Sequence, residues 1–223
     1  MQTRRELVRT LAGVACLAPA RIQSRTSQPR TVEIRKEPHR LNQESVEGYR
    51  LLLGELPALS FYRNAAAQAD LIIAPAAIGV TAIEAKNLGM RVLRGATLIF
   101  ESALGFCEPR DTVEQRGMLN DIFALGIGKP VSVDPTERAS GLQVNYCWPL
   151  QRSTRTFESL TPVDCRESEA IALIGGEPVC LAKKWGKGTL VYLGSMLGPA
   201  LFAEEREAKA IGAALLTSSF APQ

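Results

Sequence analysis

A continuous apolar run in the middle of the chain constrains the fold more than any other feature. Residues 70–75 read Asp-Leu-Ile-Ile-Ala-Pro, so that four consecutive apolar side chains are closed by a proline. A strand that is covered on one face alternates apolar and polar residues, whereas a strand covered on both faces is apolar throughout. Doubly covered strands are typical of parallel sheets with helices on both faces. The run therefore predicts an α/β fold.

The rest of the chain alternates between helical and extended patterns. Helices are predicted over 43–56, 82–93, 111–125 and 203–216, and strands over 31–34, 58–62, 96–100, 142–147 and 170–174, with 151–159 as a surface loop. Thr81 with Glu84, and Asp111 with Glu114, predict two capping boxes. Two β-type runs, 178–183 and 189–193, flank a glycine-bearing turn and predict a hairpin. The expected fold class is α/β, a flavodoxin-like three-layer sandwich whose mainly parallel sheet carries a C-terminal β-hairpin.

The N-terminal segment has the pattern of a targeting signal. Thr3-Arg-Arg-Glu-Leu-Val-Arg9 and the short apolar run up to Ala20 resemble a twin-arginine export signal. We therefore expect a signal peptide over 1–20, a linker over 21–31 and one α/β domain over 32–223, in a periplasmic or extracellular location. Two alternatives stay open, an amphipathic cytosolic helix and a lipoprotein signal with Cys16 as the acylated residue.

Charge and hydropathy limit the expected partners. The whole chain has a net charge of +3, and removal of residues 1–20 takes away three arginines and one glutamate, which leaves +1. A nearly neutral body lacks the concentrated basic surface that nucleic-acid binding requires. The apolar run of the signal is about ten residues long, and a membrane span needs roughly twenty. We expect neither a nucleic-acid partner nor a membrane span.

Four cysteines remain after the signal is removed, and they are Cys107, Cys147, Cys165 and Cys180. In an oxidising compartment an even number of cysteines permits disulfides, here with three possible pairings, although four unpaired thiols remain an equal alternative. No two of them have Cys-x-x-Cys spacing, and the single histidine, His39, has no nearby metal-ligating partner. We expect no metal site and no cofactor.

The central segment resembles class I glutamine amidotransferase-like domains. In those domains a strand ending in a proline-containing turn is followed by a helix, a glycine and a second strand, as in residues 70–75, Gly95 and residues 96–100 here. The closing segment 177–194, with its proline and Gly-Lys-Gly turn, is similar to trehalose-utilisation-type proteins and β-galactosidase trimerisation domains. The resemblance extends over about residues 58–217 and implies an amidotransferase-like fold.

The chain departs from this superfamily where the chemistry would lie. Active members place a cysteine nucleophile in a tight turn after the second strand, and a histidine further along the chain. Here that strand runs into Glu101 and Ser102, Cys107 follows several residues later, and His39 precedes the region. A thiol without a neighbouring base is mostly protonated near neutral pH. The sequence therefore predicts that the amidotransferase triad is absent.

Four residues are expected at the carboxyl edge of the sheet, where open α/β sheets bind ligands. They are Pro75, Glu101, Ser102 and Ser195, and helix capping or loop hydrogen bonding is the structural alternative for them. The leading interpretation is an exported, non-catalytic amidotransferase-like binding or interaction domain. Its expected partners are a small polar, carbohydrate-related ligand, a partner protein or a second copy of the chain. The alternative is a hydrolase with a non-standard site around Glu101, Ser102 and Cys107.

Overall fold

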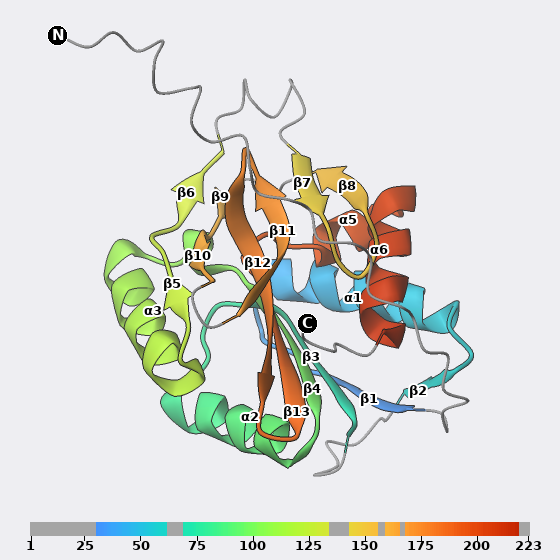
Figure 1. Ribbon diagram of the computed structural model, residues 1–223, viewed down its shortest axis with the longest axis horizontal. Coiled ribbons are helices and arrows are strands. Elements are labelled where there is room, and N and C mark those ends of the chain that lie inside the picture. Colours follow the sequence, from blue (N-terminus) through green and yellow to red (C-terminus); the bar gives the residue numbers. More distant parts are fainter. Residues whose placement is uncertain (1–29, 62–68, 134–142, 156–158, 166–167, 219–223) are drawn as a thin grey trace, which may run out of the picture.

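A nine-stranded sheet forms the centre of the molecule in the computed structural model, which describes residues 30–61, 69–133, 143–155, 159–165 and 168–218. The strand order is β2-β1-β3-β4-β13-β12-β11-β7-β8 (Figure 1). The strands of this sheet are β1 (Arg30–Ile34), β2 (Leu59–Phe61), β3 (Leu71–Ala77), β4 (Thr97–Ser102), β7 (Gln143–Tyr146), β8 (Arg152–Arg155), β11 (Glu169–Ile174), β12 (Glu177–Trp185) and β13 (Gly188–Leu193). Two small sheets pair β5 (Gly126–Ile127) with β10 (Val163–Asp164), and β6 (Val131–Ser132) with β9 (Ser159–Leu160).

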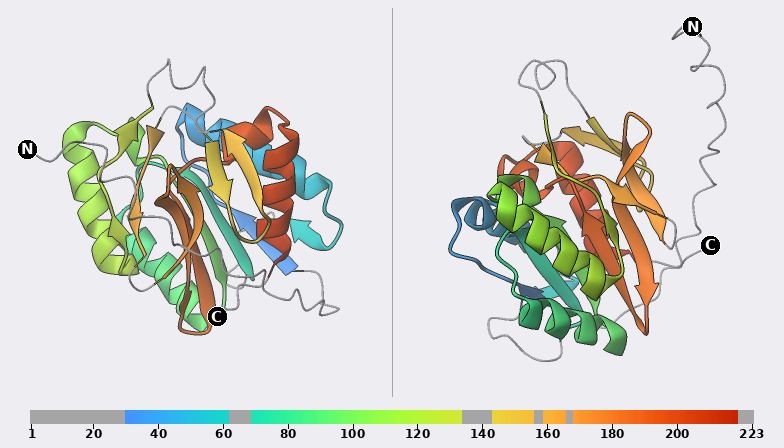
Figure 2. Two further views of the ribbon diagram at one scale, coloured as in Figure 1. Left: turned by 45° about the horizontal axis from the view of Figure 1, so that its top comes forward. Right: turned by 90° about the vertical axis from the view of Figure 1, so that its left-hand side faces the viewer.

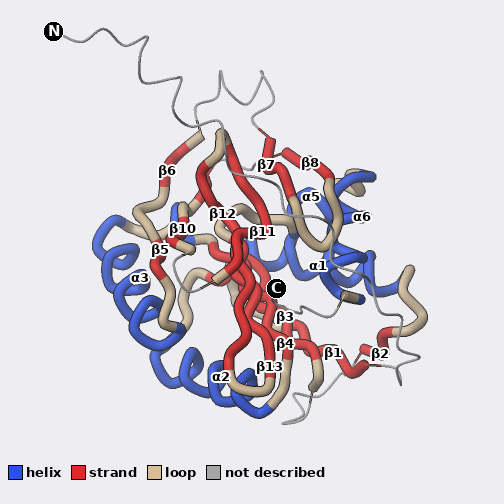
Figure 3. The backbone as a smooth tube through the Cα atoms, in the orientation of Figure 1, coloured by secondary structure: helices blue, strands red, loops and turns tan. Residues whose placement is uncertain are grey.

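The large sheet is mixed rather than mainly parallel. Strands β2, β1, β3, β4 and β13 run parallel to one another, whereas β12, β11, β7 and β8 follow in antiparallel pairs. The predicted hairpin is confirmed as β12 and β13, with Gly186 in the turn at φ 62°. Its second strand pairs in parallel with β4, so the hairpin joins the two halves of the sheet instead of adding strands at one side. Figure 3 shows the strands in red between the blue helices.

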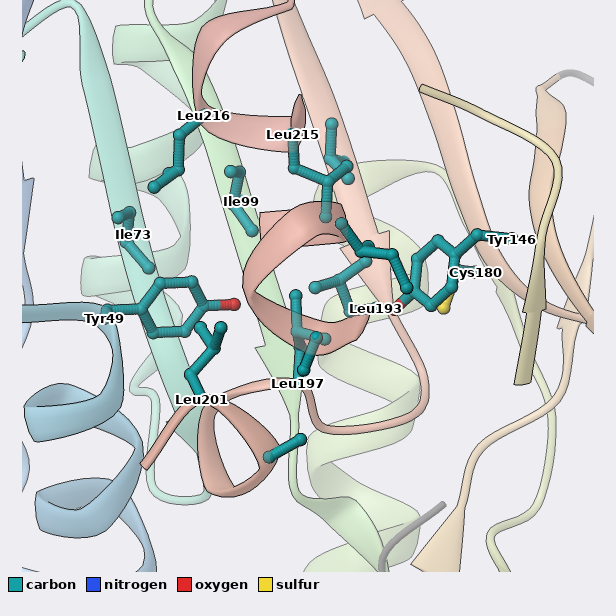
Figure 4. Close-up of a cluster of buried hydrophobic side chains, with 14 of the residues drawn as sticks. Tyr49, Ile73, Ile99, Tyr146, Cys180, Leu193, Leu197, Leu201, Leu215 and Leu216 are labelled. Carbon is teal, nitrogen blue, oxygen red and sulfur yellow. The ribbon is translucent and has the colours of Figure 1, made fainter. Parts of the chain in front are cut away.

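Helices cover both faces of the sheet. On one face lie α2 (Ala82–Arg94) and α3 (Pro109–Phe123), and on the other α1 (Arg40–Gly54), α5 (Gly198–Phe202) and α6 (Arg206–Thr217). The left-hand view of Figure 2 shows the two groups separated by the strands. Figure 4 shows that side chains of the sheet meet side chains of helices α1, α5 and α6 in one core, among them Tyr49, Ile73 and Leu215. On the opposite face Phe100 stacks on Tyr192, with ring centroids 6.0 Å apart.

Strand β3 is buried at every position, as its apolar sequence predicts. The capping box of α2 is also confirmed, because the Thr81 side chain accepts from the Glu84 N–H while the Glu84 side chain accepts from the Thr81 N–H. The inner face of this helix consists of Ala85, Leu88 and Val92 as expected, with Gly89 beside them, and Gly95 is the C-cap that terminates the helix. The sequence therefore predicts strand β3 and helix α2 correctly, because the apolar run and the capping residues act on neighbours only a few positions away.

Two local predictions are wrong. Helix α3 has Glu108 as its N-cap without a side-chain hydrogen bond, and Asp111 lies inside its first turn instead of capping it. A proline at the start of the helix supplies the favourable first position. Residues 152–155, expected in a loop, form the edge strand β8, which pairs with β7. The predicted helix 203–216 is confirmed as α6, Arg206–Thr217, and the short helix α5, Gly198–Phe202, which precedes it was not predicted.

The expected signal peptide, residues 1–20, and most of the expected linker lie outside the described residues. The last two residues of that linker, Arg30 and Thr31, belong to β1. Among the described residues, no helix combines the length and the apolar character that crossing a membrane requires.

Candidate functional site

The carboxyl edge of the parallel strands is organised around Glu101. Strand β4 extends to Ser102, so Glu101 lies within the strand and its side chain is fully buried, at 0% exposure. One carboxylate oxygen, Oε2, accepts a hydrogen bond from the Ala76 N–H at 2.8 Å. The other, Oε1, accepts from the Gly198 N–H at 2.6 Å and also from the Leu197 N–H. The carboxylate therefore joins β3, β4 and the start of α5.

Burial and hydrogen bonding act on the Glu101 carboxyl in opposite directions. Burial raises its pKa above the ordinary 4.5, and the backbone N–H groups of Gly198, Ala76 and Leu197 lower it by less. The charged form is thus tolerated only because donors of the protein itself surround it. A carboxylate in that state serves as an internal acceptor, and it lacks the solvent contact that a reacting group at a binding edge requires.

Pro75 lies where β3 bends away from its neighbour. The β3–β4 register shifts between Ala74 and Ala77, and Ala76 adopts φ 40°, in the left-handed region. The Pro75 carbonyl accepts a hydrogen bond from Asn42 Nδ2 at 2.6 Å, and Asn42 Oδ1 accepts from the Glu37 N–H at 2.7 Å. The bend thereby turns the Ala76 N–H toward Glu101, and α1 supports it from one side.

Ser102 and Ser195 are buried at the same edge, at 3% and 2% exposure. The Ser102 hydroxyl oxygen accepts from the Leu104 N–H at 3.4 Å. Ser195 forms an isolated antiparallel bridge with Leu160. Above these residues Ala76, Ala103 and Met196 form a small buried cluster against the partly buried Leu41, Ile78 and Phe106. Side chains of the chain itself therefore fill this part of the edge.

Cys107 and His39 have separate roles in the structure. The Cys107 thiol is half-buried and donates to the Ile78 carbonyl at 3.7 Å. Burial raises the pKa of this thiol, and the charges of Asp111 and Glu37 raise it further. His39 is the N-cap of α1, where its Nδ1 accepts from the Leu41 N–H at 3.2 Å. The thiol is therefore held in its protonated form, and the imidazole has a structural partner of its own.

The structure brings together the sequence-predicted residues at one edge and uses their polar atoms internally. Sequence reasoning missed Asn42 and Gly198, because both contact the edge from segments far away in the chain, 33 and 97 residues from their partners. The spacing of the sequence carries no signal for such contacts. The approach of Gly198 to Ser45 is equally invisible, although a Cβ at Gly198 would lie 2.5 Å from the Ser45 hydroxyl.

Away from this edge, the described residues form an open pocket of about 390 Å³. Its lining consists of Gly126, Gly128, Pro162, Val163, Asp164, Cys165, Glu177 and Pro178. These residues lie in or directly beside β5, β10 and the start of β12, so the pocket shares none of the predicted site residues. Within the described ranges, no group of three or more metal-ligating side chains gathers in one place.

Comparison with known proteins shows the fold. No protein-family model and no curated protein matches the chain. Among solved structures it is similar to a cold-adapted β-galactosidase from Rahnella sp. R3, with a TM-score of 0.59 and 17% identity over 84% of this chain. It is also similar to the β-galactosidase of Bacillus circulans sp. alkalophilus, with a TM-score of 0.57 and 15% identity over 86% of this chain. The chain spans about 30% of the length of both enzymes.

A smaller protein matches over most of its own length. The cytoplasmic protein STM1381 from Salmonella typhimurium LT2 has a TM-score of 0.57 and 12% identity, over 76% of this chain and 85% of its own. At such identities the likeness concerns the fold alone. The resemblance to an amidotransferase-like domain of β-galactosidases, which the central and closing segments indicate, is confirmed at that level.

Proposed function

We propose that the chain is an exported, non-catalytic amidotransferase-like domain that acts by binding a protein partner, first of all a second copy of itself. The observation that carries the proposal is the state of Glu101. It occupies the end of β4, where active members of the superfamily hold their nucleophile region, and it is fully buried with three backbone N–H groups on its carboxylate. The order β2-β1-β3-β4-β13 of the parallel strands supports a flavodoxin-like frame for this domain.

The filled edge favours a protein partner over a small ligand. A sugar or another polar ligand needs a concave site with accessible polar groups. Here Ser102 and Ser195 are buried, and the Met196 cluster covers the edge. We therefore assign Pro75, Glu101, Ser102 and Ser195 to the internal frame of the domain. The hydrolase alternative requires a reactive Cys107, and the raised pKa of its thiol disfavours that role.

The surface offers apolar side chains for association. Ile83 and Met90 on α2 are 73% and 48% exposed, and Val113 on the contacting helix α3 is 62% exposed. Large apolar side chains that remain exposed on neighbouring helices are a feature of association surfaces. Self-association is the preferred form, because the fold is similar to part of two β-galactosidases and the closing segment is similar to β-galactosidase trimerisation domains.

The solution mass of the chain tests this proposal. Light scattering of residues 21–223 is expected to give a multiple of the chain mass at tens of micromolar protein. Replacement of Ile83 by Glu on the exposed face of α2 should lower the mass to that of one chain. The matched control is Lys86→Glu, on the same exposed helix and without an apolar side chain to lose. A single-chain mass for the native protein at every concentration contradicts the proposal.

Turnover assays test its non-catalytic part. Chromogenic esters, amides and galactosides should be hydrolysed at the same rate by the native chain, by Cys107→Ala and by buffer alone. Turnover that exceeds the buffer rate and disappears in Cys107→Ala would instead establish the hydrolase. Export is tested by a fusion of residues 1–31 to a reporter, in which Arg4→Lys together with Arg5→Lys should abolish translocation.

A further inference from the structure

The hairpin of β12 and β13 ends in a turn that packs on the last turn of α2. The Lys187 N–H donates to the Leu93 carbonyl at 3.1 Å, and a Cβ at Gly186 would lie 2.8 Å from the same carbonyl oxygen. Behind this contact the Trp185 ring lies against Gly89, where a Cβ would meet the ring at 2.7 Å. The end of α2 and the turn of the hairpin therefore form one continuous surface, at the bottom of Figure 1.

The side chains of this surface are apolar and basic. We call it the tip surface, and it consists of Leu93, Arg94, Lys184, Trp185 and Lys187. Leu93 is 37% exposed and Trp185 is partly buried, whereas the three basic residues are exposed. Lys184 Nζ donates to Thr189 Oγ1 at 3.0 Å, which holds its charge at the same end of the sheet. Three positive charges thus surround apolar atoms, and the tip surface contains no carboxylate.

The positive charge of the tip surface is local. Beside it, at the starts of β1 and β3, the charges of Arg30 and Asp70 offset each other. Without residues 1–20 the net charge falls from +3 to +1, because three arginines and one glutamate are removed. Three of the positive charges lie on the tip surface, so the rest of that chain carries a net charge of −2. This asymmetry orients the molecule with its tip toward an anionic partner.

We propose that the tip surface binds the anionic headgroups of a lipid bilayer, with the exposed parts of Leu93 and Trp185 at the boundary of the acyl chains. Lysine and arginine are attracted by the negative surface potential of such a bilayer, and apolar side chains supply the second signal that stable peripheral binding needs. Tryptophan suits this boundary, because its ring is apolar and its N–H is polar. The binding is peripheral and requires no membrane span.

The shape of the tip surface favours a bilayer over an acidic protein. Both views of Figure 2 show the turn of the hairpin at the lower end of the molecule. A bilayer is soft and needs no complementary hollow, whereas a protein partner needs a matched surface. The open pocket lies at the opposite end of β12, at Glu177 and Pro178, so it adds no concave site to the tip.

The inference goes beyond the proposed function and does not depend on it. The tip surface lies at the C-terminal end of α2, whereas Ile83, which the self-association test replaces, lies in its first turn. Vesicles are supplied in the assay, so the result requires neither export nor self-association. Ile83→Glu should therefore keep a preference for anionic vesicles even where its solution mass is that of one chain.

Co-sedimentation with vesicles tests the proposal. Residues 21–223 are mixed at about 0.1 M salt with vesicles of phosphatidylglycerol and phosphatidylcholine in equal parts, and separately with vesicles of phosphatidylcholine alone. We expect binding to the anionic vesicles that is at least about tenfold tighter than binding to the neutral ones. Binding should be lost at about 0.5 M salt, because salt screens the attraction. Equal binding to both kinds of vesicle overturns the proposal.

Charge reversal locates the binding surface. Lys187→Glu should weaken binding to anionic vesicles by at least about fivefold, and Lys184→Glu with Lys187→Glu by more than about twentyfold. Arg110→Glu is the matched control, because it changes the net charge as much as Lys187→Glu does. It is exposed at the start of α3, beyond the carboxyl end of β4, and a six-residue strand separates the two edges by about 20 Å.

The control should change vesicle binding by less than about twofold, since this separation exceeds the Debye length of about 10 Å at 0.1 M salt. Equal losses in Lys187→Glu and Arg110→Glu overturn the proposal. Capture of the chain by polyglutamate instead of vesicles, with the same dependence on Lys187, overturns it in favour of an acidic protein. A changed solution mass of Lys187→Glu without vesicles overturns it in favour of an interface between copies.

Tryptophan fluorescence tests the orientation on the bilayer. The chain has two tryptophans, so Trp148→Phe leaves Trp185 as the reporter. Anionic vesicles with brominated acyl chains should quench its emission, and Lys187→Glu should reduce the quenching. If Trp148→Phe does not fold, the same comparison is made with both tryptophans present. Vesicle binding without quenching would mean that another surface contacts the bilayer, which overturns the proposal.

Discussion

The Gly198 N–H donates a hydrogen bond of 2.6 Å to the Glu101 carboxylate across 97 residues of sequence. This bond attaches the segment after β13 to the end of β4, and it is possible only because Gly198 lacks a side chain. A Cβ there would lie 2.5 Å from the Ser45 hydroxyl oxygen and 2.7 Å from the Ser45 Cα. Residues of α1 and β4 therefore both lie against the backbone of Gly198, the first residue of α5.

Gly198→Ala should destabilise the domain by about 3 kcal/mol, because the new methyl group overlaps α1 and displaces the donor of Glu101. Gly117→Ala is the matched control, since nothing lies within 4 Å of a Cβ at that position of α3. It should stabilise by about 0.5–1 kcal/mol through helix propensity. Urea unfolding of both variants checks the difference, and equal stability of the two would show that the predicted overlap does not exist.

The stability contributed by Glu101 should depend on pH in a defined direction. Its folded pKa is raised above the unfolded value of 4.5, so the folded state binds the proton more tightly. The proton-linked part of its contribution is complete below about pH 4.5 and is lost as the pH rises through the folded pKa, whereas the hydrogen bonds that its oxygens accept are a separate contribution. The unfolding free energy of the native chain minus that of Glu101→Gln should therefore increase as the pH falls from about 7 to about 4.5. A difference that decreases over this range would mean that the folded pKa is lowered.

Cys107 should react slowly with alkylating reagents. Burial and the nearby charges of Asp111 and Glu37 raise the pKa of its thiol above 9.0, so little thiolate exists at neutral pH. Timed iodoacetamide labelling with peptide mass spectrometry should show Cys147 modified before Cys107. The Cys107 rate should rise with pH to a midpoint above 9. Fast labelling at neutral pH would indicate an activated nucleophile.

Lys183→Met should destabilise the domain by about 2–3 kcal/mol. The buried Lys183 ammonium group donates to the Phe123 carbonyl at 2.5 Å and to the Ala124 carbonyl at 2.7 Å. These are two of the carbonyls at the C-terminus of α3 that have no partner within the helix. Lys86→Met on the exposed face of α2 is the control and should change the unfolding free energy by less than about 0.5 kcal/mol. A similar effect of both variants in urea unfolding would contradict the capping role.

An element could be predicted from the sequence when the residues that determine it lie close together in the chain. The central strand, the capping box at Thr81 and the β12–β13 hairpin depend on neighbours within a few residues, and the sequence predicted all three. The edge strand β8 was not predicted, because a polar strand is recognisable only through its pairing with β7. The antiparallel extension of the sheet was missed for the same reason.

At the candidate site the sequence predicted which residues share an edge but not what they do there. Strand β4 was expected to end at Phe100, and its extension by two residues places Glu101 inside the strand. Whether a carboxylate at a strand end faces solvent or the interior depends on the segment that packs over it. Here that segment is residues 194–198, which directly follow β13, the second strand of the hairpin.

The central claim is that Glu101 holds the frame of the domain together and takes no part in binding or catalysis. The unfolding free energy of Glu101→Gln at about pH 7 tests this most directly. An amide can accept hydrogen bonds through one atom only, and its NH₂ group would oppose a backbone N–H. We therefore predict a loss of about 2–4 kcal/mol, against a change below about 0.5 kcal/mol for the exposed Glu114→Gln. A Glu101→Gln domain as stable as the native chain, or more stable, would contradict the account and mark Glu101 as a functional carboxylate.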